Sequence, residues 1–167
     1  ISPQGDFLTQ RDYPRMALIH PQWRGGLLEI SAPGMPSHTL EPSDHGLQRR
    51  VTIWRDTCEA VDQGEAAAEW FGAFLGAACR LVRLADDFTR QVDQRYSPRA
   101  TDQASFSDGF PFMIISQASL DDLNRRLDTP LPMNRFRPNL VITGSEPFAE
   151  DTWKLIRVGG LLFDVVK

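Results

Sequence analysis

The residues best suited to binding a ligand form the short run Arg137, Pro138 and Asn139, just before the apolar stretch 140–143 (LVIT). Proline fixes its own φ and disfavours helical geometry in the residue before it, so we expect Arg137 to be extended. Arg137 carries a permanent positive charge, and the Asn139 amide can both donate and accept hydrogen bonds. A cation and an amide held beside a strand suit an anionic ligand that also forms hydrogen bonds.

A second polar run, Ser107, Asp108 and Gly109, precedes another apolar stretch, 112–115 (FMII), which we predict to be a buried strand. Gly109 has no side chain and therefore lets a ligand approach the backbone closely. The sequence thus places two polar sites at the ends of two buried strands.

A short helix is predicted between these two strands. Ser116 or Ser119 would be its N-cap, and Asp121 and Asp122 would lie in its first turn, where the helix dipole favours anions. The leucines that would face the core recur at i, i+3 and i+7, as Leu120, Leu123 and Leu127.

The first half of the chain reads as several short strands separated by turns, which favours a small β-barrel or sandwich. The strands are expected at 15–20, 27–31, 39–41, 48–54, 58–61 and 80–84. One amphipathic helix is expected from Gly64 to Ala78, with Asp62 as its N-cap. An aromatic stripe of this kind usually packs in a core, so Trp70, Phe71 and Phe74 are predicted to be buried against the strands.

The segment 86–104 is polar and lacks a sustained period, and its arginines 90, 95 and 99 alternate with acids. It is either a solvated crossover between two modules or a loop that borders the mouth of a pocket. Towards the end of the chain, Gly159 and Gly160 separate two runs that predict a hairpin, 154–158 and 161–166. The predicted class is therefore mainly β with a few helices (α+β), divided into 1–85, a crossover 86–104, and 105–167.

The composition is that of a globular protein, with 167 residues of which 41% are hydrophobic and 24% charged. A net charge of −4 argues against a protein that binds nucleic acid through its overall field. No apolar run approaches the roughly 20 residues that span a bilayer, and no signal peptide is visible. Because the chain starts at Ile1 rather than methionine, a targeting segment could have been lost. We expect a cytoplasmic protein.

Other residue types that could perform chemistry are read as structural. Cys58 and Cys79 have no disulfide or metal-ligand spacing and are expected to be small core residues. His20, His38 and His45 show no zinc-site spacing, so no metal ligands are expected within the chain. Glu150 and Asp151 could form an acid pair, but adjacent carboxylates before an aromatic residue are common in turns, and a structural role is preferred.

Four stretches resemble the MOSC family, the C-terminal domain of molybdenum cofactor sulfurase, in their order and spacing. They are SDGFPFMIIS, ASLDDLN, RFRPNLVITG and FAEDTW. Upstream, FLTQR, YPRMALI and AVDQGEAAAEWFGAFLG resemble the N-terminal β-barrel module of the branch that contains the mitochondrial amidoxime-reducing component and bacterial reductases fused to a ferredoxin domain. The resemblance implies a small N-terminal β-barrel module packed against a MOSC-type β-barrel module, truncated at both ends.

The resemblance further implies that a molybdopterin-type molybdenum cofactor binds between the two modules. The positions that match the family's cofactor contacts are Arg11, Asp108, Gly109, Phe110, Arg137 and Asn139. Without the resemblance, Arg11 would be read as a solvated loop arginine. With it, we predict that Arg11, Arg137 and Asn139 converge on one pocket, because a cofactor phosphate needs cations from both modules.

The implied activity is molybdenum-dependent reduction of small N-hydroxylated compounds, with electrons from a ferredoxin-type [2Fe-2S] domain or partner. The alternatives are a non-catalytic module that carries sulfurated cofactor to other enzymes, and a β domain without a ligand. The family is also associated with pyridoxal phosphate binding. Its Lys-Ser pair would lie upstream of Ile1 and its metal-binding cysteine beyond Lys167, so we expect a fragment that is inactive by itself.

Overall fold

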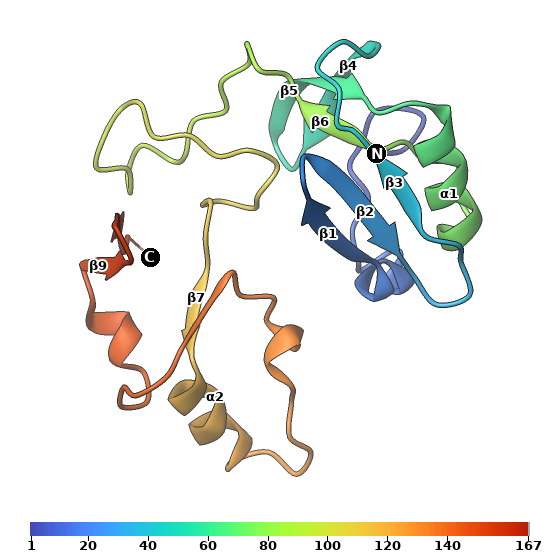
Figure 1. The fold of residues 1–167 in the computed structure, drawn as a ribbon. Helices are drawn as coiled ribbons and strands as arrows, with labels where there is room; N and C mark the ends of the chain where they lie inside the picture. The colour runs from blue at the N-terminus through green and yellow to red at the C-terminus, as the bar shows by residue number, and fades with distance from the viewer. Residues whose placement is uncertain (167) are drawn as a thin grey trace. The chain divides into compact units, whose positions relative to one another are not determined.

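The computed structural model describes residues 1–166, which form two compact units, Ile1–Arg90 and the segment from Gln91 onward. Short strands predominate, with two α-helices and three 3-10 helices among the described residues (Figure 1). The predicted class, mainly β with a few helices, is confirmed.

The first unit contains two antiparallel three-stranded sheets. The first sheet has the order β1-β2-β3, with β1 at His20–Arg24, β2 at Leu27–Ser31 and β3 at His38–Leu40. The second has the order β4-β5-β6, with β4 at Gln48–Ile53, β5 at Asp56–Asp62 and β6 at Val82–Leu84. Most of the predicted strands are therefore present, with ends shifted by a few residues.

The core of the first unit forms where helix α1 (Glu65–Leu75) packs on β2. Trp70 and Phe74 lie against Ile30 in this cluster, and the Trp70 indole Nε1 donates a hydrogen bond of 2.7 Å to the Pro36 carbonyl. Phe71 is half-buried at the edge of the same cluster. The aromatic stripe of α1 is thus a packing surface, as predicted.

Two local predictions in this unit are wrong. The segment 15–20 is not a strand: Pro14–Leu18 is the 3-10 helix η1, none of whose side chains is buried. Proline in a first turn presets helical φ, and this outweighs the apolar run that follows. Helix α1 is also shorter than 64–78, and its N-cap is Gly64 rather than Asp62, whose Oδ1 instead accepts a hydrogen bond from the Gly64 amide at 2.9 Å.

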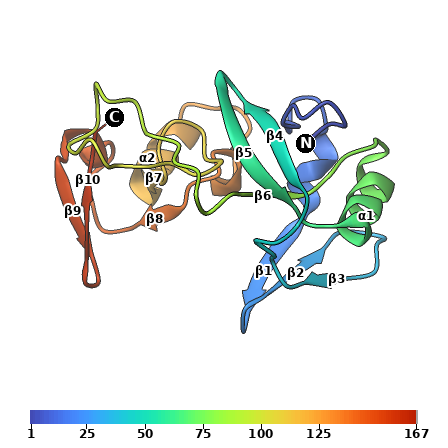
Figure 2. The ribbon, with the colours of Figure 1, turned by 90° about the horizontal axis from the view of Figure 1, so that it is seen from above.

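The second unit contains two strand pairs. Strands β7 (Ile114–Ser116) and β8 (Leu140–Ile142) are parallel, and β9 (Leu155–Val158) pairs antiparallel with β10 (Leu161–Asp164). The connection from β7 to β8 contains helix α2 (Gln117–Asn124) and the 3-10 helix η2 (Met133–Arg135) (Figure 2). A third 3-10 helix, η3 (Ala149–Thr152), precedes the hairpin that the sequence predicted.

Helix α2 begins as predicted but differs in detail. Ser116 is its N-cap, and its Oγ accepts a hydrogen bond of 3.0 Å from the Ser119 amide. Asp121 and Asp122 are not in the first turn, because the helix begins at Gln117. Leu127 lies beyond the end of the helix and is exposed, so the predicted row of three leucines is incomplete.

The predicted buried strand 112–115 is also only partly correct. Phe112 and Met113 precede β7, and both are exposed. The apolar run marks the region of the strand, but its first half belongs to the loop.

The polar segment 86–104 is irregular, with an isolated bridge between Gln91 and Gln103. It is not uniformly solvated, because Arg90 is buried and its Nε donates to Asp56 Oδ2 at 2.7 Å. Val92 and Ala104 are buried as well. Among residues 1–166, no helix has the length and apolar character that crossing a membrane would take.

Candidate functional site

The parallel pairing of β7 and β8 brings the two predicted polar runs of the second unit to one edge. Ile114 pairs with Leu140, so the residues before them, Met113 and Asn139, are neighbours. The Asn139 and Leu140 amides donate to the Met113 carbonyl at 2.9 and 3.0 Å. The run 107–110 and the run 137–139 therefore both lead into the amino ends of these two strands.

Asn139 holds this edge together with its side chain. Its Oδ1 accepts a hydrogen bond of 2.8 Å from the Met113 amide. The amide oxygen is thus engaged by the backbone, and the NH₂ group is the part of Asn139 that can donate to a ligand.

Arg137 is exposed but is not extended, contrary to the prediction. Its φ is +55°, in the left-handed region. The Arg137 amide donates to the Asn134 carbonyl at 3.2 Å, so Arg137 is the last residue of the turn that follows η2. A non-glycine residue held this way costs roughly 1–2 kcal/mol. No ion pair among residues 1–166 involves the Arg137 guanidinium, so its charge is available to an anion.

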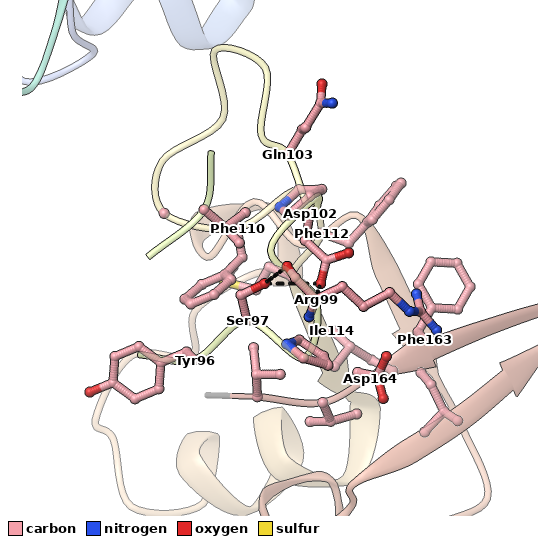
Figure 3. A pocket seen from close by; sticks show the side chains of 18 of the residues that line it. Tyr96, Ser97, Arg99, Asp102, Gln103, Phe110, Phe112, Ile114, Phe163 and Asp164 are labelled. Carbon is pink, nitrogen blue, oxygen red and sulfur yellow. Dashed lines mark hydrogen bonds between the residues drawn. The ribbon is translucent and has the colours of Figure 1, made fainter. Parts of the chain in front are cut away.

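A cavity of about 520 Å³ opens in the second unit, and Asp108, Gly109 and Phe110 line it (Figure 3). Its wall is mainly apolar and aromatic; the Phe110 ring meets the Tyr96 ring edge to face, with centroids 6.2 Å apart. Beside Gly109, only the adjoining residues lie within 4 Å of the point where a Cβ would stand. The Gly109 backbone is therefore open to close approach.

The charges on the cavity wall do not favour a phosphate. Arg99 lines it together with Asp102, Asp108 and Asp164, one guanidinium against three carboxylates. Figure 3 shows the Arg99 side chain extending toward Phe163 and Asp164. The wall therefore suits an uncharged organic group better than an anion, and neither Arg137 nor Asn139 is part of it.

The three arginines of the polar segment have separate roles. Arg90 is the buried partner of Asp56, and Arg95 forms an exposed pair with Asp93 at 2.6 Å. Arg99 alone of the three lines the cavity. Segment 86–104 is thus anchored by the buried Arg90 rather than solvated at its start, and it borders a cavity at Arg99.

Arg11 lies in the first unit and is exposed. Its guanidinium carbon stands 5.7 Å from the ring centroid of Trp54, a cation–π contact. Sequence reasoning missed Trp54, because it was read as the last residue of a strand. The structure makes it the first residue of the two-residue turn between β4 and β5, with φ at +57°. The available sequence signal was that Trp54 and Arg55 stand between two strand-like runs where a hairpin turn normally has glycine.

Glu150 has the structural role that the sequence favoured. It is buried, and its Oε1 accepts from the Ser116 amide at 2.9 Å and from the Ser119 hydroxyl at 2.6 Å. Burial by itself raises the pKa of this carboxyl, but the hydrogen bonds from Ser119 and Ser116 hold the pKa below its ordinary value. Glu150 thus links η3 to the start of α2 as an ionised group.

Neither cysteine is placed to bind a metal. Cys58 and Cys79 are both buried in the first unit, and burial raises the pKa of each thiol, so both are protonated at neutral pH. Over the part of the chain that the structure describes, no three His, Cys, Asp or Glu side chains are grouped to hold a metal ion. The described groups that can bind a ligand at these positions are thus the Arg137 guanidinium and the Asn139 NH₂, which suit anions and hydrogen-bond acceptors rather than a metal ion.

Comparison with protein families matches both halves of the chain. Residues 1–78 match the MOSC N-terminal beta barrel domain, and residues 101–167 match the MOSC domain. The solution structure of a Bordetella bronchiseptica protein is similar with a TM-score of 0.46 and 27% identity, over 52% of this chain and 70% of that one.

Characterised relatives match over nearly the whole chain. Mitochondrial amidoxime-reducing component 1 of Mus musculus is 32% identical over 95% of this chain and 48% of its own length. The Homo sapiens component 1 is 34% identical over 95% of this chain and 49% of its own length. The Homo sapiens component 2 is 33% identical over 96% of this chain and 50% of its own length. The chain thus spans about half the length of the curated relatives that it matches.

Proposed function

Because the chain belongs to the MOSC family, as a MOSC N-terminal barrel domain followed by a MOSC domain, we propose that it is the cofactor-binding part of a molybdenum-dependent oxidoreductase. The reaction proposed is the reduction of small N-hydroxylated compounds, of which amidoximes are one class, since relatives that are 32 to 34% identical are named amidoxime-reducing components. The observation that carries the proposal is the shared edge of β7 and β8, where Asn139 bonds Met113 and the segments that contain 107–110 and 137–139 enter the two strands.

In this proposal Arg137 and Asn139 hold the polar end of the cofactor. The Arg137 guanidinium binds the phosphate with charge-assisted hydrogen bonds, each contributing roughly 1.5–3 kcal/mol. The Asn139 NH₂ group donates to the edge of the pterin, and Gly109 admits it close to the backbone. Arg11 adds a second cation from the first unit. When bound, the cofactor supplies the redox centre for the two-electron reduction.

Residues of the cavity wall would receive the uncharged organic part of a ligand. Phe110 and Tyr96 offer aromatic faces there, and the surplus of carboxylates keeps anions away from the wall. The charged and uncharged parts of one ligand would then be recognised by different residues.

The metal ligand is proposed to be neither Cys58 nor Cys79. Molybdenum favours a soft thiolate, and both thiols are buried and protonated. A thiolate from outside these 167 residues would complete the metal site. We propose a ferredoxin-type [2Fe-2S] domain or partner as the electron donor and the cytoplasm as the location.

A carrier module that binds the cofactor and passes it to other enzymes is the second candidate. Such a carrier needs only to hold the organic part of the cofactor, which the groups proposed above, Arg137 and Asn139, could bind. The two functions differ in whether an N-hydroxylated substrate is turned over.

The test is to load the purified chain, and a longer polypeptide of the relatives' length, with molybdenum cofactor released from a donor enzyme. Pterin content and reduction of an amidoxime by a viologen donor are then measured side by side. We expect both to bind cofactor and only the longer polypeptide to reduce the substrate. Transfer of cofactor to an apo-acceptor without turnover by either would favour the carrier. Turnover by the 167-residue chain that survives Cys58→Ala and Cys79→Ala would refute the thiolate argument.

A further inference from the structure

Trp54 occupies a backbone position that a large residue rarely adopts. Strand β4 ends at Ile53 and β5 begins at Asp56, so Trp54 and Arg55 form a two-residue hairpin loop. Trp54 has a φ of +57°, and Arg55 is not among the described residues with positive φ. Loops with positive φ at the first position only normally have glycine there. The backbone of a tryptophan at this position is strained, and residues with strained backbone are concentrated at functional sites.

Phe7 fixes one side of the Trp54 indole. The two rings meet edge to face, with centroids 4.6 Å apart. The segment that bears Phe7 is itself fixed to β4, since the Phe7 amide donates to the Thr52 carbonyl at 3.1 Å and the Thr52 amide donates to the Gly5 carbonyl at 2.9 Å. Gly5 is necessary here, because a Cβ at that position would lie 2.8 Å from the Arg50 carbonyl oxygen.

Arg11 reaches the same indole from a tight turn. The Asp12 and Tyr13 amides donate to the Thr9 carbonyl, and the Arg11 amide donates to Thr9 Oγ1 at 3.1 Å. The Asp12 carboxylate accepts from the Thr9 hydroxyl at 2.8 Å rather than pairing with Arg11. The backbone of Arg11 is therefore held by the Thr9 turn and its guanidinium by Trp54.

An aromatic face holds a guanidinium without neutralising it. Arg15 of the first unit also lies over an aromatic ring, that of Phe74 at 4.4 Å, whereas three others are held by carboxylates: Arg90 by Asp56, and Arg49 and Arg80 by Asp62. A carboxylate partner cancels the charge and occupies the N–H donors that a phosphate would need. The face of the Trp54 ring attracts the cation. The N–H groups, which point outward in the plane of the guanidinium, remain available.

We propose that Trp54 is a positioning residue for Arg11, orienting its guanidinium for the anionic group of the bound cofactor. The inference rests on the proposed function, since it takes Arg11 to be a cofactor contact. Arg137, the other arginine proposed to bind the phosphate, also has positive φ. Strained backbone would thus orient both arginines. For Arg137 the strain is in its own backbone, and for Arg11 it is in the backbone of Trp54, its aromatic partner.

The test measures binding of released molybdenum cofactor by pterin content at increasing cofactor concentration. Trp54→Leu should bind about threefold to tenfold more weakly than wild type, and Trp54→Phe should stay within about twofold, because it keeps a ring over which the guanidinium can lie. In an Arg11→Ala background, Trp54→Leu should have no further effect, since there is no guanidinium left to orient. Trp23→Leu, at another exposed indole of the first unit, should bind as wild type.

Thermal unfolding of each variant separates positioning from folding. A Trp54→Leu variant that unfolds at the wild-type temperature and still binds cofactor as wild type, while Arg11→Ala binds weakly, overturns the inference and leaves the proposed function intact. Equal losses for Trp54→Leu with and without Arg11 also overturn it, because Trp54 would then act independently. Absence of binding by the wild-type chain refutes the proposed function itself.

Discussion

The two units bury their apolar residues very differently. The first has a closed core around Ile30, Trp70 and Phe74, with exposed fractions of 1, 7 and 1%. In the second, the described apolar residues that are buried are Val92, Ala104 and Leu120, whereas the β9–β10 hairpin exposes Leu155, Val158, Leu161 and Leu162. An isolated hairpin of this kind is marginally stable by itself. Core packing therefore stabilises the first unit more than the second.

Each unit also has a buried carboxylate among its described residues, and the one in the first unit has the stronger partners. Asp62 is paired with Arg49 and Arg80, whereas Glu150 is held by the neutral donors of Ser116 and Ser119. Glu150 Oε2 is buried without a hydrogen-bond partner among the described residues. The comparison predicts that substitutions in the first unit have the larger effects on stability.

The largest effect is expected for Phe74→Ala. Phe74 is fully buried and stacks on Trp70 with ring centroids 5.9 Å apart, so its truncation should cost about 3–5 kcal/mol of unfolding free energy. Denaturant titration of the chain measures this cost, with Leu161→Ala on the exposed hairpin as control, expected to lose less than about 0.5 kcal/mol. Equal losses in the two variants would show that the units do not differ as described.

Asp62→Ala should have the next largest effect, about 3 kcal/mol. It leaves Arg49 and Arg80 partly buried without their shared carboxylate, and it removes the acceptor of the Gly64 amide. Glu59→Ala is the matched control. It removes the ion pair with Arg50, which is exposed on the same sheet, and should cost less than about 1 kcal/mol of unfolding free energy. A small loss of unfolding free energy for Asp62→Ala would mean that the attraction between Asp62 and its two arginines only offsets the cost of removing these groups from water.

The smallest effect is the acid sensitivity of the second unit. The pKa of Glu150 lies below its ordinary value, so its ionised form contributes stability above that ordinary value, and the contribution is lost as the pH falls through the lowered pKa. Amide exchange of Ser116 and Ser119, corrected for the intrinsic rate, should therefore lose protection in acid. Glu150→Gln should flatten this dependence at a cost of about 1–3 kcal/mol. Unchanged pH dependence in Glu150→Gln would assign the acid sensitivity to another group.

Local sequence signals predicted the elements whose causes are local. The periodic stripe of α1, the Ser116 cap and the Gly159–Gly160 hairpin are all present. Competing local signals produced the errors: Pro14 outweighed the apolar run after it, and the turn after η2 outweighed the effect of Pro138 on Arg137.

The features that sequence did not predict depend on distant residues. Trp54 is more than forty positions from Phe7 and Arg11, and only the anchoring of Gly5 and Phe7 on β4 brings them together. In the same way, the engagement of the Asn139 oxygen by Met113 depends on the parallel pairing of β7 with β8. Residue types indicate which groups can bind an anion, but pairing between strands decides which of their atoms remain available.

The central proposal is that Arg11 and Arg137 are both cofactor contacts. Its most direct test is binding of released molybdenum cofactor to wild type, Arg11→Ala, Arg137→Ala and the double variant, with Arg24→Ala as an exposed control. The claim predicts one cofactor per chain, losses of about tenfold to a hundredfold for each single variant, no detectable binding by the double variant, and wild-type binding by the control. Wild-type affinity in the double variant would contradict it.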